Sequence, residues 1–340
     1  MRQLFCVMGI SKQILLCKIK KVRIPVVVSL HVTNKCNLRC SYCYSNIDGR
    51  FDAKVPELSF QEITDCIDAL HKLGTRWIVL LGGEPLLRRD IGAIIRHVKR
   101  KGMLCDLVTN GILIKSRIKD IAPIDLLCIS LDGDALANDA ARGKGSYQKI
   151  VEGLDIASAR RIRTRIHAVL TKYNCNSRSI IHLAYLARKY HASFGYSSPI
   201  GQNRHVLDLV APRDQETMFW KSVLRGKKKG LRVYNTVPAL ERLINWHYTD
   251  DRLKKARGDE ERCFAGQRFS YIDSEGYLYP CICKGVKNGL NVKEVGVEKA
   301  WNSLAGLNCK QCPCIQYIEA NEILDLKPQS IMLGLKTFFT

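Results

Sequence analysis

Residues 26–43, VVVSLHVTNKCNLRCSYC, join a β-branched run directly to three closely spaced cysteines. The run has the composition of a buried β-strand, and Cys36, Cys40 and Cys43 follow it with C-x3-C-x2-C spacing. Three thiols on one short loop can bind three irons of a cubic iron–sulfur cluster and leave the fourth iron open to another ligand. A zinc site is the alternative interpretation, but zinc takes four ligands and His31 on the strand is a poor fourth one.

From residue 24 to about residue 200, β-branched runs alternate with amphipathic helical stretches. Such alternation is typical of parallel strands joined by right-handed helical crossovers. The expected strands are Val26–Val32, Arg76–Leu81, Leu104–Thr109, Leu126–Leu131, Arg165–Thr171 and Ser193–Ser197, and the expected helices are Ser59–Leu73, Ile91–Lys101, Tyr147–Ala159 and Ser179–Tyr190. About six βα units are too few for the usual closed eight-stranded barrel. The pattern therefore predicts an α/β fold built on a partial (β/α)6 TIM-like barrel.

Short motifs with glycine or polar residues follow the second, third and fourth expected strands, at the sheet edge where α/β folds bind ligands. They are Gly82-Gly83-Glu84-Pro85, Thr109-Asn110-Gly111 and Ser130-Leu131-Asp132-Gly133. Each motif alone is also common turn chemistry. Their order behind the cysteine loop, in which Tyr42 immediately precedes the last cysteine, resembles the radical SAM superfamily over about residues 24–200.

This resemblance implies a [4Fe-4S] cluster whose ligands, and the catalytic residues, are Cys36, Cys40 and Cys43. It implies that S-adenosylmethionine (SAM) binds the open iron. The reduced cluster would cleave SAM to methionine and a 5′-deoxyadenosyl radical, which would abstract hydrogen from a substrate. An electron donor such as flavodoxin or ferredoxin is then implied as a partner.

The resemblance also implies a set of residues that bind SAM. They are Tyr42, Gly82, Gly83, Glu84, Thr109, Asn110, Ser130, Asp132, Arg142 and Leu170. The Gly-Gly-Glu-Pro element would bind the methionine amino group, and the planar guanidinium of Arg142 would meet the SAM carboxylate. Arg142 ends a segment that starts at Asn138, where the family has histidine. Leu170 would pack on adenine, although an ordinary core strand explains this residue equally well.

A second group of cysteines surrounds an expected β-hairpin, in which Phe269–Asp273 and Tyr277–Pro280 flank a glycine-containing turn. The expected metal ligands are Cys263, Cys281, Cys309 and Cys312, with Cys283 and Cys314 nearby and unassigned. Four thiols can close one metal site, and by themselves they fit a zinc ribbon as well as an iron–sulfur cluster. Beside a radical SAM core the group resembles the twitch domain, a shortened SPASM domain, which implies an auxiliary [4Fe-4S] cluster.

These features divide the chain into five expected segments. They are a basic amphipathic N-terminal extension over 1–23, a radical SAM core over 24–200, a basic helical bridge over 201–258, a small cysteine-rich twitch/SPASM-like domain of β-hairpin and helix over 259–320, and an apolar tail over 321–340. The two ends combine apolar with basic residues, which would allow peripheral contact with an anionic membrane. The alternative, which the sequence alone favours, is that they pack on the barrel with their lysines solvated.

Composition bounds the partners and the location of the protein. The chain of 340 residues carries a formal net charge of +22, which favours an anionic substrate or carrier. No apolar run approaches the ~18 residues that a membrane-spanning helix needs. The cysteines are clustered, which favours metal sites over a disulfide framework. The apolar stretch Leu4–Ile10 is followed by Lys12 and by no small-residue cleavage site, so we expect a cytoplasmic protein rather than one with a signal peptide.

The substrate is the least determined part of the prediction. Peptide modification is the first hypothesis, and a tetrapyrrole, sugar or cofactor precursor is the alternative within the same enzyme class. A basic zinc protein that binds nucleic acid is the alternative from another class. The Gly-Gly-Glu-Pro element and an aromatic content of only 8% argue against nucleic-acid binding.

Overall fold

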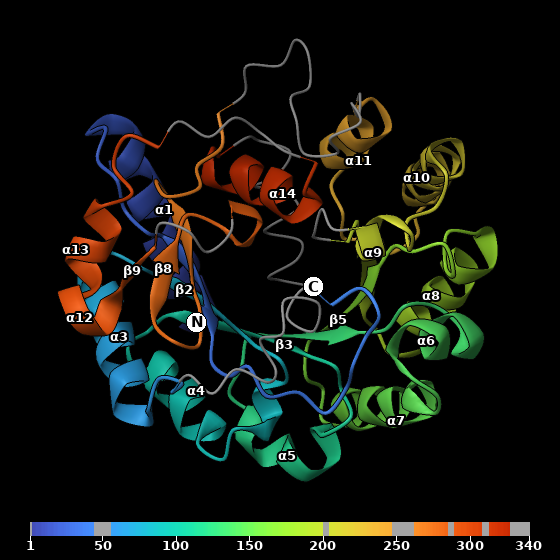
Figure 1. Cartoon of the computed structure of the whole chain (residues 1–340), viewed down its shortest axis with the longest axis horizontal. Helices are drawn as coiled ribbons and strands as arrows, with labels where there is room; N and C mark the ends of the chain where they lie inside the picture. The colour runs from blue at the N-terminus through green and yellow to red at the C-terminus, as the bar shows by residue number, and fades with distance from the viewer. Residues whose placement is uncertain are drawn as a thin grey trace.

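The computed structural model describes residues 2–43, 56–199, 204–246, 262–284, 289–307 and 313–326. Helices form an outer ring around a curved sheet, and the C-terminal part of the chain lies beside the first strands (Figure 1). The strands are β1 (Val27–His31), β2 (Trp77–Leu81), β3 (Leu104–Thr109), β4 (Leu126–Ser130), β5 (Thr164–Val169), β6 (Ser193–Ser197), β7 (Phe269–Ile272), β8 (Tyr277–Tyr279) and β9 (Leu290–Asn291). The helices are α1 (Arg2–Ile19), α3 (Phe60–Lys72), α4 (Ile91–Arg100), α5 (Ile114–Ile121), α6 (Ala135–Arg142), α7 (Ser146–Ala159), α8 (Ser177–Lys189), α9 (Arg204–Leu207), α10 (Arg213–Lys228), α11 (Val237–Ile244), α12 (Val292–Val295), α13 (Val297–Asn302) and α14 (Ile315–Leu324), with short 3-10 turns η2 (Pro85–Leu87) and η3 (Ile282–Lys284).

The sheet has the strand order β6-β5-β4-β3-β2-β1-β7-β8-β9. Strands β1 to β7 run parallel, whereas β8 and β9 are antiparallel to their neighbours. Within the described residues the sheet stays open between β6 and β9, so the predicted partial (β/α)6 barrel is confirmed. All six expected strands and all four expected helices are present, with ends within two residues of those predicted.

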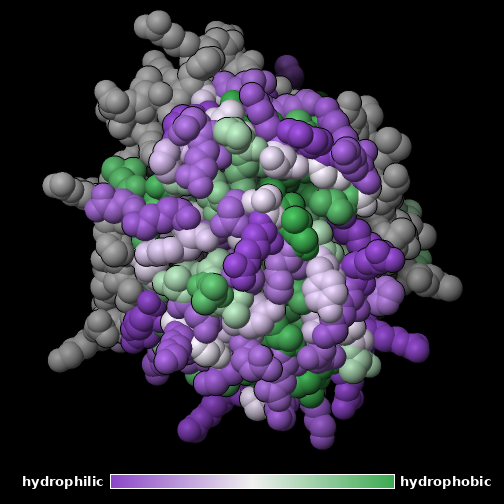
Figure 2. All heavy atoms as spheres, turned by 90° about the vertical axis from the view of Figure 1, so that its right-hand side faces the viewer, coloured by the Kyte–Doolittle hydropathy of each residue, from purple (hydrophilic) through white to green (hydrophobic). Residues whose placement is uncertain are grey.

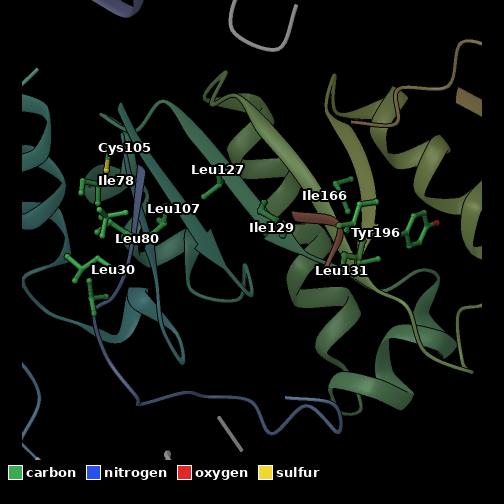
Figure 3. Packing of buried hydrophobic residues seen from close by; sticks show 14 of the residues in the cluster. Leu30, Ile78, Leu80, Cys105, Leu107, Leu127, Ile129, Leu131, Ile166 and Tyr196 are labelled. Atoms are coloured by element: carbon green, nitrogen blue, oxygen red, sulfur yellow. The ribbon is translucent and has the colours of Figure 1, made fainter. Parts of the chain in front are cut away.

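The outer face of the sheet forms the main hydrophobic core. Leu30, Ile78, Leu80, Leu107 and Ile129 come from four adjacent strands, are fully buried, and pack toward the surrounding helices (Figure 3). Successive side chains of a strand point to opposite faces. The residues between these core positions therefore face the inside of the curved sheet, and that inner face is free to carry polar chemistry.

The C-terminal hairpin extends the same sheet. Strand β7 pairs in parallel with β1, with Val27 opposite Phe269 and Leu30 opposite Ile272. The Tyr271 hydroxyl lies 2.8 Å from Nδ1 of His31, which is fully buried. This contact makes His31 part of the junction between β1 and β7, which disfavours the alternative that it is a zinc ligand. The hairpin expected between residues 269 and 280 is confirmed.

The N-terminal helix α1 packs on the sheet through one face. Cys6, Ile10, Ile14 and Cys17 are buried in a second hydrophobic cluster, which also contains residues of β3, β7 and α14. Near the end of the helix, the Lys18 ammonium lies 3.1 Å from the Asp325 carboxylate. The sequence-based preference for packing on the barrel is thus confirmed for this face of the N-terminal extension, while most of the expected apolar tail, residues 327–340, lies outside the described residues.

The surface shows no helix suited to spanning a bilayer. Within the described ranges, none of the helices is long and apolar enough to cross a membrane. Figure 2 shows the side that lies at the right of Figure 1, where hydrophilic residues predominate and apolar ones are scattered between them. Ile181 on α8 and Met218 on α10 are among the exposed apolar residues of the chain, each 68% exposed.

Candidate functional site

The cysteine loop follows β1 and is fixed by backbone contacts to two other elements. Gly83 N donates to Thr33 O at 2.7 Å, and Glu84 N donates to Lys35 O at 2.8 Å. On the other side, Ser41 N donates to the carbonyl at the end of α6, Ala141 O, at 2.9 Å. The loop is therefore held between the turn after β2 and the helix after β4, at the carboxyl ends of the strands.

Burial differs among the three thiols of this loop. Cys40 is buried, whereas Cys36 and Cys43 are partly exposed. Burial raises the pKa of the Cys40 thiol to about 12, and the nearby Arg142 guanidinium opposes this rise. Cys36 and Cys43 also act on the pKa of Cys40, so the three sulfurs lie within electrostatic range of one another. Cluster binding would have to release the Cys40 proton, because the thiolate is the metal ligand.

The donor chemistry of the loop fits an iron–sulfur cluster. Three thiols with no nitrogen ligand in the group are the soft set that iron–sulfur clusters take. As the side chains stand, the described ranges contain no group of three or more His, Cys, Asp or Glu residues that could hold a metal ion. Cys36, Cys40 and Cys43 would be the residues that hold the cluster.

The two glycines after β2 are needed for a close approach of two loops. A Cβ on Gly82 would lie 2.7 Å from Thr33 O, and a Cβ on Gly83 would lie 2.5 Å from Asn34 O. Both distances are too short for any side chain. The sequence predicts these glycines as points where backbone approaches SAM, but the space of the missing Cβ atoms is taken by the backbone that leads into the cysteine loop.

Glu84 joins the turns after β2 and β3. It is fully buried, and its carboxylate accepts hydrogen bonds from Thr109 Oγ1 at 2.7 Å, Asn110 N at 2.8 Å and Leu86 N at 3.0 Å. The Asn110 side chain in turn donates to Asn37 Oδ1 in the cysteine loop at 2.7 Å. The structure thus brings Gly82, Gly83, Glu84, Thr109 and Asn110 together around the cysteine loop.

Asp132 is the centre of a buried charged network after β4. Arg142 donates to both carboxylate oxygens, from Nε at 2.8 Å and from Nη2 at 3.1 Å. The Tyr42 hydroxyl donates to the same carboxylate at 2.6 Å, and Val169 N donates at 2.9 Å. Both side chains are almost completely buried, since 6% of the Arg142 side chain and none of the Asp132 side chain is exposed. Three predicted SAM-binding residues, Tyr42, Asp132 and Arg142, therefore form one unit.

Asn138 occupies the position at which the family has histidine, and it supports this unit. Its side-chain carbonyl accepts from Asp132 N at 3.2 Å, and its amide donates to Ser146 Oγ at 2.8 Å. Arg142 lies one helical turn further along α6, as the spacing required. Asn138, in place of the family's histidine, is therefore a hydrogen-bonded member of the buried network around Asp132.

The structure places the other two predicted SAM-binding residues differently from each other. Ser130 ends β4 and is partly exposed, in register with His167 of β5. Leu170 is buried in the main hydrophobic core. Its neighbour Val169 instead packs against the cluster that contains Cys40 and Tyr42. The geometry favours Val169 over Leu170 for a contact beside the cysteine loop, because adjacent strand residues face opposite sides.

A polar group on the inner face of the sheet was missed by sequence reasoning. His167 contacts Tyr234 Oη through Nδ1 and Ser197 Oγ through Nε2, the latter at 3.0 Å. Burial lowers the pKa of His167 to about 4, so the ring is neutral at pH 7. The Arg165 guanidinium lies 5.0 Å above the Tyr234 ring, and its buried Nε has no hydrogen-bond partner among the described residues. The sequence signal that could have identified this group is the alternation of side chains along the fifth expected strand, which places Arg165 and His167 on the same face.

Glu319 of α14 closes this polar group, and its titration can be tested. Its carboxylate accepts from Asn235 Nδ2 at 3.1 Å and Thr236 N at 3.0 Å. Burial raises its pKa to about 7, compared with roughly 4.3 in an unfolded chain. Ionisation of Glu319 therefore lowers the free energy of unfolding progressively as the pH rises from about 4 to about 7, and the loss stays constant above pH 7.

We expect Glu319→Gln to stabilise the protein at pH 8, by about 2 kcal/mol, and to have little effect at pH 4.5. The glutamine oxygen can accept the same hydrogen bonds without the cost of ionisation. Urea unfolding followed by circular dichroism at both pH values measures the difference, and Glu241→Gln on the exposed face of α11 is the control. A stabilisation that is equal at the two pH values would contradict the raised pKa.

The second cysteine group is only partly described. Cys263 and Cys281 are buried in the same hydrophobic cluster, at the start of the hairpin segment and just after β8. The predicted ligands Cys309 and Cys312 lie outside the described residues. The two unassigned residues, Cys283 and Cys314, are partly exposed and lie with Cys281 around the Tyr317 hydroxyl, since all three thiols contribute to raising the pKa of Tyr317.

Comparison with known proteins agrees with this geometry. Residues 30–183 match the model of the radical SAM superfamily. AdoMet-dependent heme synthase of Methanosarcina barkeri is 26% identical over 82% of this chain and 82% of its own length. Mycofactocin maturase MftC of Mycolicibacterium smegmatis is 29% identical over 76% of this chain, and the match covers 64% of that relative.

A solved structure shows the same fold. SuiB of Streptococcus suis, in a crystal structure bound to S-adenosylmethionine, superposes with a TM-score of 0.63 over 84% of this chain and 67% of SuiB, at 18% identity. The cysteine loop, the motifs after β2 to β4 and their mutual contacts all fall within the matched residues 30–183. Residues 30–183 of this chain therefore form a radical SAM domain, the domain of a superfamily whose enzymes use a [4Fe-4S] cluster and S-adenosylmethionine.

Proposed function

We propose that Cys36, Cys40 and Cys43 hold the [4Fe-4S] cluster of a radical SAM enzyme that cleaves SAM and oxidises or cross-links an anionic substrate. The observation that carries the proposal is the clamping of the three-cysteine loop between the Gly82-Gly83 turn and α6. When bound, the cluster and SAM supply a 5′-deoxyadenosyl radical that can abstract hydrogen from an unactivated C–H bond. The residues of the chain bind and orient SAM and the substrate, and they exclude water from the site.

The roles of the SAM-binding residues follow from their contacts. The Asp132 carboxylate fixes the Arg142 guanidinium by a bidentate pair, which leaves the remaining guanidinium nitrogen to meet a carboxylate of SAM. Thr109, Asn110 and Glu84 fix the shape of the turns beside the cysteine loop. Ser130 and Val169 would line the inner side of the pocket. Preorganised groups of this kind lower the cost of orienting a reactive ligand.

The inner-face polar group supports an anionic substrate. Arg165 offers a guanidinium whose Nε has no hydrogen-bond partner among the described residues, and neutral His167 and Tyr234 stand beside it. An arginine in such a position suits a carboxylate. A peptide with an acidic group is our first candidate, and MftC is named as a maturase. A tetrapyrrole carboxylate is the second candidate, because a heme synthase matches over 82% of this chain.

One experiment tests the enzyme class. The protein would be purified without oxygen, its iron and zinc quantified, and the reduced protein incubated with SAM. We expect about eight irons per chain and formation of 5′-deoxyadenosine. Zinc in place of iron, with no 5′-deoxyadenosine, would return the protein to the class of basic zinc proteins that bind nucleic acid.

We further propose an auxiliary [4Fe-4S] cluster held by Cys263, Cys281, Cys309 and Cys312. The burial of Cys263 and Cys281 beside the hairpin supports it, because two thiols in one apolar cluster suit a metal site that excludes water. Such a closed cluster would relay an electron to or from the substrate. Cys283 and Cys314, grouped with Cys281 around Tyr317, are the residues that could replace a ligand in this set.

Replacing Cys281 by alanine is expected to lower the iron content by about one cluster, while uncoupled SAM cleavage persists because the first site is separate. Iron quantitation and 5′-deoxyadenosine measurement on the same preparation check both parts. Cys175→Ala, at a similarly buried cysteine just before α8, is the control that should leave iron unchanged. Full iron in the Cys281 variant would remove this cysteine from the ligand set.

The remaining parts of the proposal concern organisation and setting. We propose the five segments set out above, with the core over 24–200 and the auxiliary-cluster domain over 259–320, joined by the bridge over 201–258. An electron donor such as flavodoxin or ferredoxin would reduce the cluster. A reducing cytoplasm suits cluster thiols such as those of Cys36 and Cys43, which are partly exposed.

A further inference from the structure

Helix α1 has a second apolar face that the fold does not bury. Phe5, Met8, Leu15 and Ile19 are 65%, 58%, 46% and 76% exposed. With Lys12 they occupy positions i, i+3, i+7, i+10 and i+14, which is one stripe along a helix. The buried face of the same helix, which contains Ile10 and Ile14, lies on the opposite side. The exposed stripe is therefore not part of the packing that holds α1 on the sheet.

The charged residues of α1 itself and of the segment that directly follows it are all basic. Lys12 lies within it, and Lys20 and Lys21 follow its end, all three exposed. No acidic residue precedes Asp48 in the sequence, and α1 has none. Lys18 is set apart, because it pairs with Asp325. An apolar stripe with one lysine within it and two lysines after its end is complementary to a surface that is apolar inside and negatively charged outside.

We infer that α1 lies flat on an anionic lipid bilayer and anchors the enzyme there. The four apolar side chains would enter the boundary between head groups and acyl chains, and Lys12, Lys20 and Lys21 would meet lipid phosphates. The helix lies on the membrane rather than crossing it, because it is too short and too polar to span. This anchoring goes beyond the proposed chemistry and does not depend on it.

A second copy of the chain fits the stripe poorly. Residue 12 is midway between residues 5 and 19, so two stripes paired symmetrically, parallel or antiparallel, would place Lys12 against Lys12. Two like charges at the centre of an apolar contact are unfavourable. The stripe also covers only two heptads, fewer than the three to four that indicate a coiled coil. A bilayer avoids both problems.

The test uses the full-length protein and flotation with vesicles. One set contains phosphatidylcholine with about one third phosphatidylglycerol, and the other contains phosphatidylcholine alone. We expect the wild type to bind the anionic vesicles at least about tenfold more tightly, and Phe5→Gln/Ile19→Gln to lose about tenfold of that affinity. Lys12→Gln should lose about fivefold, as expected for one lysine near an anionic surface.

Matched controls separate α1 from the general positive charge of the protein. Ile181→Gln/Met218→Gln changes two residues of similar exposure on α8 and α10, and Lys149→Gln removes an exposed lysine from α7. Both controls should bind as the wild type does. Equal binding of the Phe5→Gln/Ile19→Gln variant and the wild type would overturn the inference, and so would wild-type binding that does not distinguish the two vesicles. The inference would also be overturned if the wild type formed a dimer without lipid and the Phe5→Gln/Ile19→Gln variant were monomeric, since a second copy would then occupy the stripe.

Discussion

Replacing Cys40 by alanine is expected to abolish the reductive cleavage of SAM. Cys40 is the buried thiol of the three, and its backbone and that of Ser41 are held by hydrogen bonds to Cys43 and Ala141. With two thiols left, the loop cannot bind three irons, and SAM loses the site to which it would attach. Formation of 5′-deoxyadenosine by the anaerobically reconstituted, reduced variant should fall to the level of a sample without protein.

Two comparisons make this result specific. Cys175→Ala removes a cysteine that is similarly buried but lies in the main core, and it should retain SAM cleavage. The Cys40 variant should also keep the circular dichroism spectrum of the wild type, because the loop is anchored by backbone contacts that alanine preserves. Continued 5′-deoxyadenosine formation in the Cys40 variant would refute the assignment of the cysteine loop.

The fold was predictable because its signals are local. Leu30, Ile78, Leu80 and Leu107 alternate with inward-facing residues, so each strand could be located from a run of β-branched and leucine residues. The parallel order follows from the intervening helices. The pairing of β7 with β1 was not predictable, because it joins residues about 240 positions apart through the Tyr271–His31 contact and similar long-range packing.

The site was predictable in its residues but less so in their contacts. The motifs named Glu84, Asp132 and Arg142, and the structure brings them to one edge of the sheet. Sequence reasoning treated Glu84 and Arg142 as groups facing SAM. The Glu84 carboxylate instead accepts three hydrogen bonds from the protein, and Arg142 gives two of its guanidinium nitrogens to Asp132. Hydrogen bonds among residues from different strands leave no periodic signal. The prediction of Leu170 rather than Val169 has a similar cause. Adjacent residues of a strand face opposite sides, so an error of one position changes which side chain faces the site.

Replacing Arg142 by alanine is expected to destabilise the whole domain as well as to weaken SAM binding. The Asp132 carboxylate is fully buried, and Arg142 is its only charged partner among its described hydrogen-bond donors. Removing the guanidinium leaves a buried charge uncompensated, which costs about 3–5 kcal/mol. Urea unfolding of the cluster-free and the reconstituted protein should show the loss in both, because the pair exists without a cluster.

The surface pair of Lys115 and Glu152 provides the control for this prediction. Its side chains are 74% and 50% exposed, so Lys115→Ala should lower the free energy of unfolding far less than Arg142→Ala does. The double variant Arg142→Ala/Asp132→Asn should recover part of the stability lost by Arg142→Ala, since no unpaired charge then remains buried. If Arg142→Ala is as mild as Lys115→Ala, the buried pair does not hold α6 against the cysteine loop. SAM affinity measured in the double variant separates the two roles, because part of the stability is recovered while the guanidinium that would meet SAM is still missing.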